Sequence, residues 1–86
     1  MVVAMMQPRE VELDTRGRLC PQPILDLDAA IASLAVGESV RILSDDAAIR
    51  LDLPAWCQSN GHELLELQPL ERAWVGRIRK MHDRGF

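Results

Sequence analysis

Residues 10–23 read EVELDTRGRLCPQP, and this stretch predicts a strand, a short loop and the start of a helix. Polar and apolar residues alternate from Glu10 to Asp14, which is typical of a strand with one buried face. Residues 15–19 contain one glycine and form the loop. Pro21 and Pro23 lack N–H donors, so they suit the first turn of a helix, where such donors have no partner within the helix. Cys20 is therefore expected where the chain passes from loop to helix.

The next segment predicts a helix and a second strand. Apolar residues recur at helical spacing from Pro21 to about Ala35; they are Ile24, Leu27, Ile31 and Leu34. Gly37 lies where the helix would end or the chain would turn. Val40 and Ile42 mark a strand over residues 38–44.

The second half of the chain predicts another helix and a hairpin. Pro54 does not suit the interior of a helix, so we expect a separate helical turn over residues 47–50. The main helix then starts at Asp52 or Leu53 and ends near Gly61. Residues 63–68 and 72–80 predict two strands around a turn at Pro69-Leu70-Glu71.

The element order βαβαββ predicts a two-layer α/β sandwich. Four strands form a mixed sheet, and the two helices pack on one face of it. The other face is then open, and its alternate residues should be polar. We expect a single domain over residues 10–80, a flexible leader over residues 1–9 and a loose tail over residues 81–86. Met5 and Met6 are alternative start residues to Met1.

Composition excludes several classes of protein. The 86 residues carry a net charge of −3, and nucleic-acid binding usually needs a basic excess. No apolar run is long enough to cross a bilayer. Two distant cysteines do not suggest a secreted disulfide scaffold, so we expect a cytoplasmic protein.

Cys20 is the best candidate for a chemical centre. The start of a helix favours an anion, so the thiol is expected to ionise more readily than a free one. Arg16 and Arg18 could supplement this field; the alternative is that both are loop arginines in solvent. Pro21 and Pro23 would stiffen the junction and hold the sulfur outward. For Cys20 itself, the alternative is an inert apolar filler.

The other cysteine and the two histidines have structural explanations that compete with chemical ones. Cys57 could act as a resolving cysteine that closes a disulfide with Cys20, but it shares a helical face with Leu53 and Trp56, which predicts burial. His62 could act in acid–base or metal chemistry, and a hydrogen-bonded structural role is favoured. His82 is expected in solvent. The Cys and His spacing does not match a zinc site, so no metal is expected.

Basic residues near the end of the chain suggest a docking surface. Arg77 and Arg79 lie on one face of the last predicted strand and could meet an acidic partner or RNA; the alternative is a solvated sheet face. Partner choice would also depend on surface residues such as Arg18, Gln22 and Arg50. A protein that exposes one face to successive partners suits a monomer.

Residues 16–23, with Cys20 in the Cys-Pro-x-Pro element, resemble the signature of the TusA, or SirA-like, family of sulfur-carrier proteins. The resemblance extends over residues 11–80 and includes the segments 45–48, 52–54, 61–64 and 77–80, together with Cys57. It departs from the family pattern at Arg18 and Leu19, whose order is exchanged, and at Ala47, where a proline is common.

The resemblance implies a sulfurtransferase of βαβαββ fold with no cofactor of its own. It implies that Cys20 accepts sulfane sulfur as a persulfide from a cysteine desulfurase or a rhodanese-like donor. A downstream acceptor protein would then use the sulfur in tRNA thiolation, cofactor biosynthesis or sulfur oxidation. The pathway cannot be read from the residues.

A non-catalytic module that binds RNA or protein on the same scaffold is the alternative function. The acidic total charge and the scarcity of aromatic residues on the strands disfavour direct contact with nucleic acid.

Overall fold

The computed structural model describes residues 9–83 and confirms the βαβαββ order. The elements are β1 (Glu10–Asp14), α1 (Gln22–Ala32), β2 (Ser39–Ser44), α2 (Ile49–Asn60), β3 (Glu63–Leu70) and β4 (Ala73–Arg79). Most of the predicted leader, and residues 84–86 of the predicted tail, lie outside the described residues.

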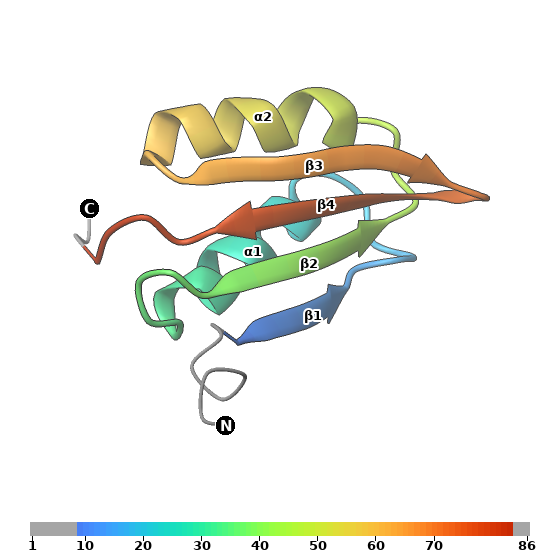
Figure 1. Cartoon of the computed structure of the whole chain (residues 1–86). Coiled ribbons are helices and arrows are strands. Elements are labelled where there is room, and N and C mark those ends of the chain that lie inside the picture. Colours follow the sequence, from blue (N-terminus) through green and yellow to red (C-terminus); the bar gives the residue numbers. More distant parts are fainter. Residues whose placement is uncertain (1–8, 84–86) are drawn as a thin grey trace.

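The sheet is mixed, as predicted. Its strand order is β1-β2-β4-β3; β1 and β2 are parallel, and the other neighbours are antiparallel. Figure 1 shows α1 and α2 on the same side of this sheet. The parallel pair arises because α1 returns the chain to the edge at which β1 began. The fold is therefore the two-layer sandwich with one open sheet face.

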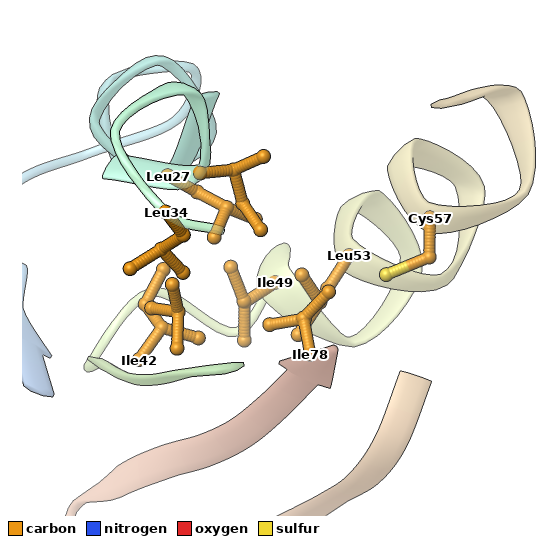
Figure 2. Packing of buried hydrophobic residues seen from close by; sticks show 9 residues of the cluster. Leu27, Leu34, Ile42, Ile49, Leu53, Cys57 and Ile78 are labelled. Carbon is orange, nitrogen blue, oxygen red and sulfur yellow. The ribbon is translucent and has the colours of Figure 1, made fainter. Parts of the chain in front are cut away.

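The core lies between the helices and the sheet. Its buried residues come from both helical segments and from the two central strands, and they are Leu27, Ile31, Leu34, Val40, Ile42, Ile49, Leu53, Cys57 and Ile78. Figure 2 shows the aliphatic side chains of the two layers converging. Gly76 lets α2 come close to the sheet, because a Cβ there would lie 2.4 Å from Leu53 Cδ2.

The second helix differs from the prediction. It is a single helix from Ile49 that continues through Pro54, not a separate turn followed by a helix from residue 52 or 53. Ile49, Leu53 and Cys57 recur every fourth residue and are all buried. Burial of this face outweighs the loss of one N–H donor at Pro54, so tertiary packing overrides the local signal.

Two predicted boundaries also move. Helix α1 ends at Ala32, where the prediction placed its end near residue 35. The hairpin turn lies at residues 71–72, because β3 continues through Pro69 to Leu70. Strand β3 is an edge strand, and an edge tolerates a residue that has no N–H to donate.

The open face of the sheet is partly apolar, whereas we predicted polar residues throughout. On this face, Arg41 of β2 lies opposite Arg77 of β4, and Leu43 lies opposite Val75. Leu43 and Val75 are buried, although they lie outside the core that the helices cover. Cross-strand contact between two such side chains removes part of their apolar surface from water.

Candidate functional site

The two parallel strands, β1 and β2, end side by side, and these C-terminal strand ends form one edge of the sheet, which is not the lateral edge formed by an outer strand. The loop after β1 leads to α1, and the loop after β2 leads to α2, so both helices begin at this edge (Figure 1). Thr15 ties the loop after β1 to the end of β2: its backbone N–H and its hydroxyl both donate to the Leu43 carbonyl. The Gly17 N–H donates to the carboxylate of Asp45.

Cys20 is exposed at this edge and contacts two carboxylates from the other loop and helix. Its thiol donates to Asp52 Oδ2, with 2.8 Å between Sγ and the oxygen. Its backbone N–H donates to Asp46 Oδ2, also at 2.8 Å. Asp46 Oδ1 in turn accepts a hydrogen bond from the Ala48 N–H. The loop that carries Cys20 is therefore fixed to the start of α2.

These carboxylates reverse the predicted ionisation of Cys20. We expected the start of α1 to lower the thiol pKa, but the hydrogen bond to Asp52 raises it above its ordinary value. Desolvation and the negative charges of Asp52 and Asp46 act in the same direction. A carboxylate that accepts the S–H bond favours the protonated thiol, because a thiolate would face a like charge.

The two arginines of the loop pair with other acids. Arg16 makes a two-pronged contact with Asp14, at 2.9 Å from Nε and 2.7 Å from Nη2, and this holds the pKa of Asp14 down at about 2. Arg18 Nε lies 3.5 Å from Asp26 Oδ2. These pairings weaken the expectation that the guanidinium groups support a Cys20 thiolate, and their contribution stays a prediction.

The prolines frame the start of α1. Pro21 immediately precedes the helix, and its carbonyl accepts the Leu25 N–H. Pro23 is buried in the first turn, and the Cys20–Pro21 peptide bond is cis. Gln22, between the two prolines, donates from its side-chain Nε2 to Asp26 Oδ1.

The predicted docking residues are spread over the molecule. Arg77 and Arg79 lie on the open sheet face. Arg77 is paired with Glu10 and Glu66, and Arg79 is paired with Glu63. Arg50 is at the start of α2, with its guanidinium 5.5 Å from the centre of the Trp74 ring. Only Arg50 among these three is close in the fold to the edge that carries Cys20.

Asp46 and Asp52 are site residues that the sequence patterns did not single out. They belong to segments that carry the family resemblance, yet neither was expected to act at the site. A topological signal was present: residues that follow β2 must meet residues that follow the parallel strand β1. Combining that rule with the thiol at Cys20 would have placed Asp46 near it.

Cys57 is buried, as predicted, with 3% of its surface exposed. Figure 2 shows its sulfur on the core side of α2, near Leu53. Desolvation raises its pKa to about 11. This environment does not favour a role for Cys57 as a resolving cysteine, because the reactive form of a cysteine is the thiolate.

The histidines lie at the opposite end of the sandwich. His62 Nδ1 accepts the Met81 N–H, and its ring stacks between Trp56 and His82. Burial, with the nearby charges of His82 and Lys80, lowers the pKa of His62. His82 Nε2 lies 2.8 Å from the Asn60 carbonyl, so the prediction of a solvated His82 was wrong.

A groove of about 760 Å³ adjoins these histidines. Within residues 9–83, no cluster of three or more His, Cys, Asp or Glu side chains has the arrangement of a metal site. None of the helices described in these residues has the length and apolarity needed to span a membrane.

Comparison with known proteins identifies relatives over most of the chain. The family model described as Sulfurtransferase TusA matches residues 11–80. A Pseudomonas paraeruginosa protein named Sulfur carrier protein TusA is 34% identical over 79 residues, which cover 92% of this chain and 100% of the relative. A Pseudomonas putida protein of the same name is 35% identical over 71 residues, covering 83% and 89% of the two chains.

A solved structure supports the fold. The crystal structure of a SirA-like protein from Desulfitobacterium hafniense superimposes with a TM-score of 0.73 and covers 84% of this chain and 99% of its own. The two sequences are 23% identical, so this likeness concerns the arrangement of the elements.

Proposed function

This chain belongs to the TusA family, and on that basis we propose that it is a sulfur carrier whose Cys20 accepts sulfane sulfur as a persulfide and passes it to another protein. The observation that carries the proposal is the exposed Cys20 thiol at the sheet edge where both helices begin. A soft nucleophile in this position can reach a sulfur atom held by a second protein.

The exchange is redox-neutral. Cys20–SH reacts with a donor persulfide R–S–SH to give Cys20–S–SH and R–SH. The Cys20 sulfur bonds to the outer sulfur of the donor, the donor S–S bond breaks, and its electron pair leaves on R–S⁻, which takes up a proton. Delivery repeats the exchange with an acceptor thiol. No cofactor is needed, because sulfane sulfur is carried on the cysteine itself.

The surface around Cys20 suits contact with proteins. Leu19, next to Cys20, is 75% exposed, and Leu51, next to Asp52, is 74% exposed. When a partner covers apolar side chains that are in water in the free protein, the free energy of the complex is lowered. The donor would be a cysteine desulfurase or a rhodanese-like protein, and a monomer in the cytoplasm would meet each partner in turn.

The downstream use of the sulfur is set by the acceptor, and tRNA thiolation, cofactor biosynthesis and sulfur oxidation all fit this chemistry. The alternative RNA-binding function is less well supported, because Arg77 and Arg79 are already paired with glutamates. Their charge is therefore largely balanced within the molecule.

The test is mass spectrometry of the intact protein and its peptides. One sample is incubated with cysteine and a pyridoxal-phosphate cysteine desulfurase, and a second with polysulfide. We expect the added mass of one sulfur on the Cys20 peptide, removed by reductant.

Cys20→Ser should carry no sulfur, whereas the matched variant Cys57→Ala should load normally. Loading of neither sample, with Cys20 open to alkylation, would reject the sulfur-carrier function and favour a binding module.

A further inference from the structure

We propose that Asp52 is the base and acid of the sulfur exchange: its carboxylate takes the proton of the Cys20 thiol as the thiol attacks, and it gives a proton to the Cys20 sulfur when the persulfide is delivered. The inference rests on the proposed sulfur-carrier function and assigns a catalytic role to a second side chain. It starts from one contact, the 2.8 Å approach of Cys20 Sγ to Asp52 Oδ2.

The contact joins two separate elements that are fixed to each other. Cys20 precedes α1, and Asp52 lies in the first turn of α2, 32 positions further along the chain. Asp46 holds the Cys20 backbone, and the Asp52 N–H donates to the Ala48 carbonyl. A general base must lie within hydrogen-bond reach of the proton that it removes, and Asp52 meets this condition before any donor binds.

The charges around the sulfur explain why a base is needed. Asp52 and Asp46 both face Cys20 and oppose a free thiolate, and they raise the thiol pKa. The charge of each loop arginine is directed to another acid, because Arg16 is paired with Asp14 and Arg18 with Asp26. The resting state is therefore a neutral thiol beside a carboxylate, and attack requires that the proton leave the sulfur as the new bond forms.

On loading, the S–H proton moves to Asp52 while the Cys20 sulfur attacks the outer sulfur of R–S–SH. The donor S–S bond breaks, R–S⁻ departs with the electron pair, and the proton on Asp52 neutralises it through solvent. The products are Cys20–S–SH and R–SH, so atoms, charge and electrons balance. Cys20 and Asp52 line a small hollow together with Pro23, Ile24 and Ile49, and these apolar side chains cover one side of the reacting sulfur.

On delivery, an acceptor thiol R′–SH loses its proton, which Asp52 takes up through solvent. The resulting acceptor thiolate attacks the outer sulfur of Cys20–S–SH, and the Cys20 sulfur leaves with the electron pair. A protonated Asp52 then gives its proton to that sulfur and restores the thiol–carboxylate pair. Two adjacent carboxylates make a bare thiolate a poor leaving group, so protonation at this step speeds release. One side chain thus serves both halves of the relay.

The test compares Asp52→Asn with the full-length wild-type protein in two rate measurements over pH 6 to 9. Alkylation by iodoacetamide reports the thiolate present, and stopped-flow loading from polysulfide reports sulfur transfer. Because the amide is uncharged, we expect the alkylation profile of Asp52→Asn to shift to lower pH. The ratio of the transfer rate to the alkylation rate should fall about 100-fold. Asp52→Glu, which keeps a carboxylate, should recover most of that ratio.

Asp28→Asn is the matched control, since Asp28 is an exposed aspartate beside the groove at the other end of the molecule. It should leave both profiles unchanged, and circular dichroism checks that each variant is folded. An unchanged ratio in Asp52→Asn would overturn the role of Asp52 and leave the carrier function standing. In that case transfer would rise in step with alkylation, and the carboxylate would only suppress ionisation of the thiol. Absence of sulfur on the wild-type protein would instead reject the carrier function, and this role with it.

Discussion

The two thiols of this protein have raised pKa values with different main causes. Cys20 is exposed, and its pKa is raised first by the hydrogen bond to Asp52. Cys57 is buried in the core, and desolvation alone raises its pKa to about 11. A charge beside a thiol can take up its proton, whereas an apolar surrounding offers no place for that proton to go. A raised thiol pKa is therefore compatible with reactivity at Cys20 and with inertness at Cys57.

The largest expected difference is in native-state alkylation. At pH 8, iodoacetamide should modify Cys20 about 1000-fold faster than Cys57, because Cys57 reacts only when the core opens. Peptide mass spectrometry over time gives both rates in one sample. Urea should remove the difference. Similar rates in the native protein would show that the core around Cys57 opens readily, and the contrast between the two thiols would not hold.

The second prediction concerns stability at alkaline pH. The unfolded Cys57 thiol loses its proton near pH 9.0, while the buried one keeps it up to about pH 11. The folded state then holds more protons, so the free energy of unfolding is undiminished below pH 9 and falls as pH rises toward 11. The loss should be about 2 to 3 kcal/mol by pH 11.

Urea unfolding of the wild-type protein and Cys57→Ala at pH 8 and pH 11 measures this loss. Cys57→Ala should lose less free energy of unfolding between pH 8 and pH 11 than the wild-type protein. Cys20→Ser should lose nearly as much as the wild-type protein. The absence of tyrosine leaves few other groups that titrate in this window. Equal losses in the wild-type protein and Cys57→Ala would contradict burial as the cause.

The third prediction exchanges sulfur for oxygen at each position. Cys57→Ser buries a hydroxyl in an apolar cluster and should lower the free energy of unfolding by about 1 to 2 kcal/mol at pH 7. Cys20→Ser should change the free energy of unfolding less than Cys57→Ser does, since the hydroxyl stays exposed and can donate to Asp52. Denaturant titration measures both changes. A larger loss of stability in Cys20→Ser than in Cys57→Ser would show that stability depends more on the sulfur of the site than on the sulfur of the core.

The smallest effect is expected at Asp46. Asp46→Ala removes the acceptor for the Cys20 and Ala48 N–H groups and should lower the free energy of unfolding slightly, because these hydrogen bonds lie near solvent. It also removes one charge that raises the Cys20 pKa, so alkylation of Cys20 should shift to lower pH. The shift should be smaller than in Asp52→Asn, because Asp46 does not contact the sulfur. Alkylation of Cys57 in urea should not change, and a shift there would point to a general effect of the substitution.

Local patterns in the chain were sufficient to predict the architecture. Alternation over residues 10–14, the prolines around Gln22 and the helical spacing of Leu27 and Ile31 indicated the order of the elements. Burial of Cys57 followed from its place beside Leu53 on one helical face. Pro54 misled the same reasoning, because burial of a helical face is a tertiary gain that outweighs a local loss.

The position of the Cys20 thiol, at the loop that opens the first helix, follows from residues next to one another in the sequence. Its surroundings depend on the three-dimensional fold. Asp46 and Asp52 contact Cys20 across 26 and 32 positions of the chain, and the arginines nearest in sequence are paired elsewhere. The two levels differ because a pKa depends on charges and hydrogen bonds within a few ångströms, and folding brings those partners from distant parts of the chain.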